Sequence, residues 1–218
     1  MTPAEENYLA AIFKISQHHG TPVGTTTLSE QLGTTPASVS DMLKKLSDKS
    51  LIHYEKYYGA RLTDSGNTAA TKLVRKHRLW ETFLVKKLNF SWAEVHEIAD
   101  QLEHIKSDLL VERLDTYLDF PRFDPHGDPI PDAAGKFTLR KQERLRDLNI
   151  GEGGVVVGVQ DHGEDFLTRL DRVSIQMGTI IHVLDQYAYD KSVKVSTNDS
   201  AYATLSDEIT RKIYVRKI

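Results

Sequence analysis

The sequence predicts an α+β fold in three parts: helices that end in a β-hairpin, a helical middle region, and a small C-terminal β-barrel. Apolar residues recur at helical spacing through the first 118 residues, interrupted once by an alternating, β-rich stretch at residues 51–63. After residue 136, short β-rich runs alternate with turn residues. These patterns place the expected domains at residues 1–76, 77–136 and 137–218.

The composition is that of an ordinary globular protein, 39% hydrophobic and 27% charged, with a net charge of −3. Because cysteine is absent, disulfides, thiolate nucleophiles and zinc–thiolate sites are excluded. No apolar stretch approaches the roughly 20 residues that span a bilayer, and the N-terminus lacks signal-peptide features. We therefore expect a cytoplasmic protein with no membrane partner. By segment, the net charge is +2 for residues 1–76 and −5 for residues 77–136, so acidic residues gather in the middle region.

Two helices are expected before residue 34. Residues 5–17 carry an amphipathic pattern that ends at the breaker His18-His19-Gly20. A shorter helix follows, with Thr25 or Thr26 as its N-cap and Gly33 as its stop.

A third helix begins with Thr35 as N-cap and Pro36 at the first helical position, where a missing N–H is tolerated. Together with the second helix it predicts a helix-turn-helix. Residues 51–57 and 60–63 then alternate on either side of Tyr58-Gly59, which predicts a hairpin. A helix-turn-helix followed by a hairpin is a winged helix.

A winged helix favours double-stranded DNA as the partner. Small side chains at the start of the third helix allow close approach to a groove, and basic residues further along the helix and on the wing suit phosphate. The residues expected to face DNA are Thr35, Pro36, Ala37, Ser38, Ser40, Lys44, Lys56 and Arg61. The alternative is a small module that binds another protein, and Asp41 in the middle of the third helix favours it.

Three further helices are expected in the middle region, at residues 64–88, 91–105 and 107–118, followed by a loop at residues 120–135 rich in Pro, Gly and Asp. These helices have more apolar surface than they can bury against one another. A homodimer is the economical way to cover it.

Side chains that commonly bind metals are concentrated in this region. His77 and Glu81 lie one helical turn apart. If residues 91–105 form one helix, four more project within roughly 100° of arc: His96, Asp100, Glu103 and His104. This spacing is typical of metal sites between helices, although a solvated polar face is the alternative. His126, in the loop, is either a further ligand or a turn residue.

The C-terminal part predicts a small barrel of five strands. The β-rich runs are residues 154–159, 173–176, 180–184, 193–196 and 212–215. A turn rich in Asp and Gly at residues 161–165 separates the first two runs.

Taken together, these motifs resemble those of the iron- and manganese-dependent repressors of the diphtheria toxin repressor family. The resemblance rests on Arg75-Lys76-His77-Arg78-Leu79 with Glu81, on His96, on Asp100-Gln101-Leu102-Glu103-His104 with Ser107-Asp108, and on Pro125-His126-Gly127-Asp128-Pro129-Ile130-Pro131. It covers essentially the whole chain and implies a C-terminal SH3-like, FeoA-like domain. It also implies a homodimer that binds operator DNA when loaded with Mn(II) or Fe(II) and represses metal-uptake genes, with no enzymatic activity and no small-molecule substrate.

The resemblance implies two metal sites. One would use Asp100, Glu103 and His104 together with a residue of the first helix, which falls on Asn7 or its neighbour Glu6. The other would use His77, Glu81 and His96 with groups of the C-terminal domain, for which this sequence offers His162 and Asp165. Ala10 stands where manganese-type members often carry Glu, which makes a closely spaced pair of manganese ions less expected there. All these ligands are nitrogen or oxygen atoms, which suits Mn(II) and Fe(II), and we favour Mn(II).

Two other classes of function fit some of these residues. A di-metal enzyme of the hydrolase type also gathers carboxylates and imidazoles, but no separate nucleophile or general base stands out. A winged-helix regulator with a purely structural acidic cluster would bind DNA in the presence of a chelator.

Overall fold

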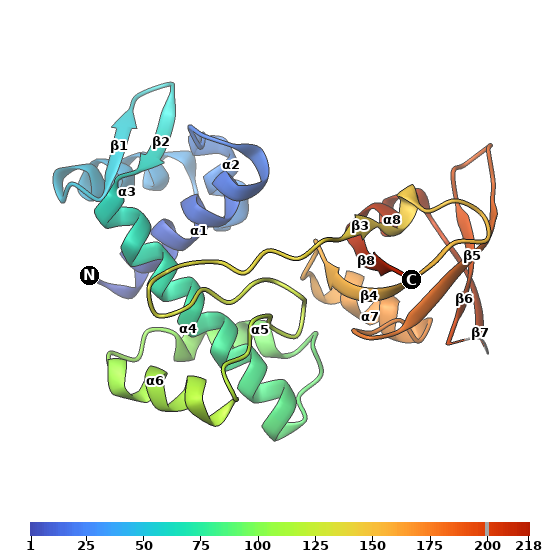
Figure 1. Ribbon diagram of the computed structural model, residues 1–218. Helices are drawn as coiled ribbons and strands as arrows, with labels where there is room; N and C mark the ends of the chain where they lie inside the picture. The colour runs from blue at the N-terminus through green and yellow to red at the C-terminus, as the bar shows by residue number, and fades with distance from the viewer. Residues whose placement is uncertain (199–200) are drawn as a thin grey trace. The chain divides into compact units, whose positions relative to one another are not determined.

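The computed structural model describes residues 1–198 and 201–218 (Figure 1). The chain divides into two compact units, each described here by itself. The first unit consists of Met1–His77, Leu102–Ser107 and Pro131–Lys136, and the second of Arg78–Gln101, Asp108–Ile130 and Phe137–Ile218. The domain boundaries expected at residues 76 and 136 remain a prediction.

The first unit contains the predicted helix-turn-helix and hairpin. Its elements are α1 (Pro3–His19), α2 (Thr25–Gln31), α3 (Pro36–Asp48), β1 (Ile52–Glu55) and β2 (Gly59–Leu62). The first helix begins two residues earlier than expected, because Thr2 and Glu5 form a reciprocal capping box. The predicted N-cap of α2 is wrong: Thr25 and Thr26 are already helical, and Gly24 is the cap.

The β-hairpin is attached to the segment between α1 and α2. Ala60 and Val23 exchange both backbone hydrogen bonds, at 2.8 and 2.9 Å. Gly59, with φ +110°, makes this approach possible, because a Cβ there would lie 2.5 Å from the Val23 carbonyl oxygen. Since Ala60 pairs with Tyr54, one residue pair before the turn of the hairpin, this bridge holds the wing close to its turn.

Buried apolar residues from all three helices and from β1 form the interior of this unit: Leu9, Ile12, Leu28, Val39, Leu43, Leu46 and Ile52. Glu5 is also fully buried, and its carboxylate accepts hydrogen bonds from Lys49 at 2.8 and 2.9 Å. A second lysine, Lys45, lies 3.0 Å from the same carboxylate. Hydrogen bonds from Lys49, then from Lys45, lower the pKa of Glu5 to about 2.

The long helix α4 (Asp64–Leu88) has the predicted bounds and is followed by α5 (Val95–Leu102) and α6 (Asp108–Tyr117). The prediction of one helix over residues 91–105 is wrong. Before α5, both the amide and the hydroxyl of Ser91 donate to Glu94, and after it the Ile105 amide bonds to the Leu102 carbonyl in a turn. The single helical face for four ligands therefore does not exist, because Glu103 and His104 lie beyond the end of α5.

The C-terminal part of the second unit is a six-stranded antiparallel sheet in the order β3-β8-β4-β5-β6-β7 (Figure 1). The strands are β3 (Glu143–Arg144), β4 (Gly153–Val159), β5 (Ile180–Gln186), β6 (Val193–Thr197), β7 (Ala201–Leu205) and β8 (Ile213–Lys217). Three helical segments accompany them, η1 (Leu145–Asp147), α7 (Glu164–Arg172) and α8 (Asp207–Lys212). This confirms the α+β class and the β-rich C-terminal domain.

Two local predictions in this part are wrong. Residues 173–176 form no strand, because the amides of Val173 and Ser174 bond back to α7 and close a turn. The expected turn at residues 161–165 ends early, since Glu164 and Asp165 already belong to the first turn of α7.

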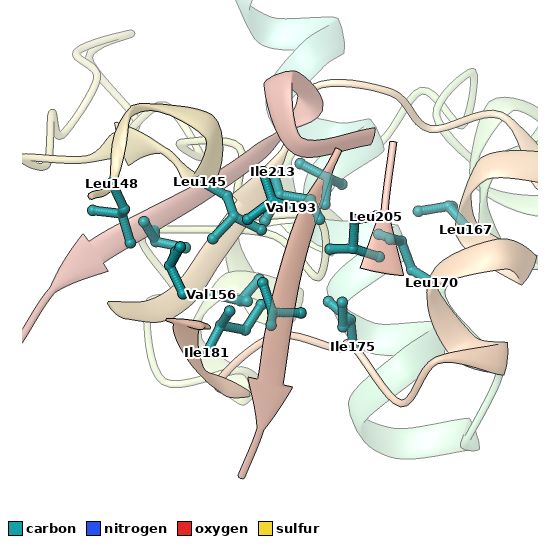
Figure 2. Close-up of a cluster of buried hydrophobic side chains, with 14 of the residues drawn as sticks. Leu145, Leu148, Val156, Leu167, Leu170, Ile175, Ile181, Val193, Leu205 and Ile213 are labelled. Atoms are coloured by element: carbon teal, nitrogen blue, oxygen red, sulfur yellow. The ribbon is translucent and has the colours of Figure 1, made fainter. Parts of the chain in front are cut away.

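Buried aliphatic side chains of the strands, η1 and α7 converge between the sheet and its helices, as Figure 2 shows for Leu145, Val156, Leu167, Ile181 and Ile213. Trp92, from the segment before α5, belongs to the same cluster. Among the residues described, no helix combines the length and the apolar character needed to cross a membrane.

Candidate metal centre and nucleic-acid interface

In the first unit, two carboxylates and two imidazoles form a chain of neighbouring side chains. The carboxylate of Glu6 on α1 lies 2.6 Å from Nδ1 of His104, whose Nε2 is 3.9 Å from the Glu103 carboxylate. Glu103 in turn lies 2.7 Å from Nδ1 of His77. His77 and Glu103 are buried, and His104 is largely so. The structure therefore places Glu103 beside His77, although the sequence predicted these two residues as ligands of different metal sites.

The first-helix position expected from the sequence is Asn7, and its side chain is exposed. The neighbouring Glu6 is the residue of α1 that reaches His104. Ala10 is buried, on the part of α1 that faces the interior. The geometry thus favours Glu6 over Asn7 as the group that α1 contributes.

In the second unit, Glu81 of α4 is almost completely buried between two imidazoles. Its Oε1 lies 3.2 Å from Nδ1 of His96, and its Oε2 lies 3.6 Å from Nδ1 of His126. His96 Nε2 is 3.9 Å from the Asp100 carboxylate, which is exposed on α5. The predicted association of Glu81 with His96 is therefore present in the geometry.

Asp124, which sequence reasoning did not single out, organises the loop that carries His126. Its Oδ1 accepts hydrogen bonds from the amides of His126 and Asp128, both at 2.9 Å. Its Oδ2 lies 3.5 Å from Nε of Arg78, which also donates to Asp128 at 2.8 Å. Burial, and then the charges of Asp128 and Glu81, raise the pKa of Asp124 to about 7.

The ring of His126 is fully buried and held in one orientation. Its Nε2 donates to the Trp92 carbonyl oxygen at 2.8 Å. The ring stacks on His162 with centroids 4.5 Å apart and lies nearly parallel to the Trp92 indole at 6.3 Å. Burial alone would lower the pKa of His126, but the Glu81 and Asp124 carboxylates outweigh it and raise the pKa to about 9.

The donor set fits a divalent cation. Single ligand atoms of Glu81, Asp124 and His126 all lie within 4.8 Å of one another, and all three residues are buried. Carboxylate oxygen and imidazole nitrogen suit Mn(II) and Fe(II). His162 is brought to this cluster, whereas Asp165 is exposed on the first turn of α7. Asp124 could have been found from the sequence as the acidic residue that opens Asp124-Pro125-His126-Gly127.

The predicted DNA-facing residues at the start of α3 are accessible. Thr35, Pro36, Ala37 and Ser38 are exposed, and Thr35 caps the helix by accepting from the Ser38 amide at 3.2 Å. The hydroxyl of Ser40 instead donates to the Pro36 carbonyl within the helix, at 2.9 Å. The N-terminus of α3 thus presents small, exposed side chains, with the Ser38 amide capped by the Thr35 hydroxyl.

The basic residues that were expected to face DNA differ in the contacts that they make within this unit. Lys44 is exposed and pairs with Asp41 at 3.0 Å. On the wing, Lys56 lies over the ring of the exposed Tyr57, 5.0 Å from its centroid, and Arg61 is exposed on β2. The wing therefore carries the basic side chains best placed to meet phosphate.

Comparison with known proteins supplies independent information. The family model for the iron dependent repressor N-terminal DNA binding domain matches residues 1–60, that for the iron dependent repressor metal binding and dimerisation domain matches residues 63–132, and that for the FeoA domain matches residues 143–217.

Curated relatives match over long stretches. The chain is 34% identical over 119 residues to an uncharacterised HTH-type transcriptional regulator of Methanocaldococcus jannaschii, covering 55% of this chain and 95% of that protein. It is 25% identical over 225 residues to the diphtheria toxin repressor of Corynebacterium glutamicum, covering 98% and 96% of the two. Among solved structures, a manganese-dependent transcriptional repressor in complex with manganese superposes with a TM-score of 0.88 at 33% identity, covering 98% of this chain and 100% of that one.

Proposed function

Because the chain belongs to the iron-dependent repressor family, which includes the diphtheria toxin repressor, we propose that it is a metal-activated repressor that binds operator DNA as a homodimer. In this proposal Mn(II) is the activating ion, with Fe(II) as the second candidate. The repressor acts in the cytoplasm, and the genes that it regulates serve metal uptake. The resemblance seen in the sequence is confirmed. The family consists of transcriptional repressors, which favours this function over a di-metal enzyme.

The observation that carries the proposal is the contact between Glu6 and His104. Glu6 belongs to α1, a helix of the winged-helix fold, and His104 follows the helix that was expected to carry ligands. A cation held by Glu6, Glu103 and His104 would replace a proton shared between these groups with fixed metal–ligand bonds. Such bonds would restrict α1 and, through the core that α1 shares with α3, the presentation of the DNA-facing residues.

The remaining ligand assignments are proposals that rest on the family resemblance and on the local contacts described above. For the second site we propose Glu81 and His96, with His77 and a group of the C-terminal domain, either His162 before α7 or Asp165 in the first turn of α7. Asp100 remains a candidate for the first site. The nitrogen and oxygen donors, and the similarity to a repressor solved with manganese, support Mn(II).

Exposed apolar side chains support a dimer. Leu109 on α6, Tyr117 at its end and Phe120 just beyond are each about 60% exposed (58%, 61% and 62%). Three large, exposed apolar groups within 12 residues are available to pack against a second copy of the chain.

The test is DNA binding at buffered metal concentration. Fluorescence anisotropy with a duplex from upstream of the gene itself should show tight binding with micromolar free Mn(II) and none after EDTA, with binding restored by added Mn(II). Sedimentation velocity should show that two chains, or a multiple of two, are bound to each duplex. Equal affinity with and without chelator would refute the proposal and favour the metal-independent regulator.

A further inference from the structure

The strand β7 (Ala201–Leu205) is the last strand at one edge of the C-terminal sheet (Figure 1). On one side it pairs with β6 along its whole length. On its other side no strand of the described residues lies next to it, and no backbone hydrogen bond outside the sheet joins it to another described segment. In an antiparallel ladder, alternate residues direct their N–H and C=O groups away from the paired neighbour. The outer side of β7 therefore offers backbone donors and acceptors to a further strand.

The opposite edge of the same sheet is protected against such pairing. There β3 consists of only Glu143 and Arg144, both charged, and the chain continues directly into η1. The strand β7 is longer and contains neither a charged residue nor proline. Short strands, charges and prolines are the usual means by which proteins prevent edge-to-edge pairing. Because β7 has none of these features, its edge is suited to receive another strand.

The side chains of β7 alternate between the two faces of the sheet. Leu205 is buried in the core cluster of the sheet, and Ala203 packs against that cluster. Tyr202 and Thr204 lie on the opposite face and are exposed, with 70% of the Tyr202 side chain accessible. A strand added beside β7 would therefore extend the core cover next to Ala203 and contact the Tyr202 ring on the other face.

The side-chain pattern of β7 is complementary to itself. If two copies pair antiparallel about a two-fold axis at Ala203, this residue meets its own copy, Tyr202 meets Thr204, and Ala201 meets Leu205. Each of the last two pairs places a large side chain beside a smaller one on the same face, and aromatic–β-branched pairs are favourable across antiparallel strands. No like charges oppose each other, because the strand carries none. This self-complementarity favours a second copy of the chain over an unrelated protein.

We propose that β7 pairs with β7 of a second copy, so that two C-terminal sheets join into one continuous antiparallel sheet. The pairing involves none of the exposed apolar residues Leu109, Tyr117 and Phe120 that support the homodimer. A chain that uses both contacts would join one homodimer to another. The β7 contact goes beyond the proposed function, since it requires neither metal nor DNA.

The first experiment is disulfide crosslinking of the full-length protein. The chain has no cysteine, so a single introduced thiol reports on this contact alone. Directly opposite residues of antiparallel strands have Cα atoms about 4.5–5.5 Å apart, which is within disulfide range. Ala203→Cys should therefore form a covalent pair of chains on mild oxidation. Ala188→Cys, in the exposed segment after β5, is the matched control and should remain largely uncrosslinked. Equal crosslinking of the two variants overturns the inference.

The second experiment is sedimentation velocity over a range of protein concentrations without metal or DNA. The wild type should pass from two chains to four as its concentration rises. Tyr202→Lys should weaken this step by roughly 10-fold or more, because a charge on an edge strand opposes pairing. Tyr189→Lys makes the same substitution at a fully exposed tyrosine beyond β5 and should behave like the wild type. Circular dichroism establishes that each variant is folded.

The outcomes separate this contact from the proposed homodimer. The same assembly for the wild type and Tyr202→Lys at every concentration overturns the inference, and this is also the result expected if the β7 edge pairs with a different protein. If the wild type passes only from one chain to two and Tyr202→Lys remains a single chain, the β7 contact stands and the homodimer proposed through Leu109, Tyr117 and Phe120 fails.

Discussion

Glu6 and His104 are 98 positions apart in the sequence, yet the carboxylate of one lies 2.6 Å from the imidazole of the other. Both side chains are largely buried. The pair joins the first helix to the turn after α5 inside one compact unit, and it leads to the first prediction.

Replacing Glu6 by Ala should raise the free Mn(II) concentration needed for half-maximal DNA binding by roughly 10-fold or more, because a metal-binding group of α1 is lost. Asn7→Ala is the matched control, since Asn7 is adjacent but exposed, and it should shift the midpoint little. Anisotropy titrations at buffered Mn(II) measure both. A larger shift for Asn7→Ala would transfer the ligand role to Asn7.

The second prediction concerns acid stability. Because Lys49 and Lys45 hold the pKa of Glu5 at about 2 in the folded protein, below its ordinary value of 4.5, Glu5 stabilises the fold above pH 4.5. This contribution is lost as the pH falls from 4.5 through about 2. Glu5→Gln should lower the free energy of unfolding at pH 7 and weaken its dependence on pH in that window.

Urea unfolding followed by circular dichroism at a series of pH values measures this effect. Glu30→Gln, at an exposed position of α2, is the control and should leave the pH profile unchanged. Parallel profiles for Glu5→Gln and the wild type would show that the two lysines do not stabilise the fold through this carboxylate.

The third prediction concerns the wing. Lys56→Ala and Arg61→Ala should each weaken DNA binding to a similar degree on specific and unrelated duplexes, because phosphate contacts carry no sequence information. Each should also reduce the slope of log affinity against log salt by about 1. Lys191→Ala, an exposed lysine of the C-terminal domain, should change neither. A loss confined to the operator sequence would indicate base contacts instead.

The fourth prediction compares two glycines with positive φ. Gly127 (φ +89°) and Gly151 (φ +86°) are equally unsuited to a side chain in their backbone conformation, but a Cβ at Gly127 would collide with the Val157 carbonyl of β4 whereas one at Gly151 meets nothing within 4 Å. Gly151→Ala should cost about 1 kcal/mol of strain. Gly127→Ala should cost clearly more and also weaken Mn(II) binding, because it displaces the loop of His126. Thermal unfolding and metal dialysis test this, and equal effects would show that the close approach to β4 is unimportant.

Sequence patterns were sufficient where the determinants are local. Thr35 and Pro36 mark the start of α3, and Asp64 and Leu88 bound α4 as expected, because caps and periodicity lie within the segment itself. The hairpin followed from alternation around Tyr58-Gly59. These elements needed no information from distant residues.

The failures have physical reasons that single-segment patterns do not contain. Ser91 and Glu94 form a turn before α5, and the Ile105 amide bonds to the Leu102 carbonyl after it, so α5 is short and His104 lies in a turn. Residues 173–176 were expected to form a strand, but the amides of Val173 and Ser174 bond to carbonyls of α7 and close its C-terminal end. The helix itself was missed because its acidic first turn was interpreted as part of a loop. The pairing of Glu103 with His77 depends on a tertiary contact that no spacing in the sequence reveals.

The bridge between Val23 and Ala60 has a consequence for local opening. Their mutual amide hydrogen bonds can be broken only when β2, close to the turn of the hairpin, separates from the segment between α1 and α2. The two amide protons should therefore exchange with solvent deuterium at one common rate, as members of a single cooperative unit. The wing would then fluctuate with the helices as one body, even at the end of the hairpin that lies next to its turn.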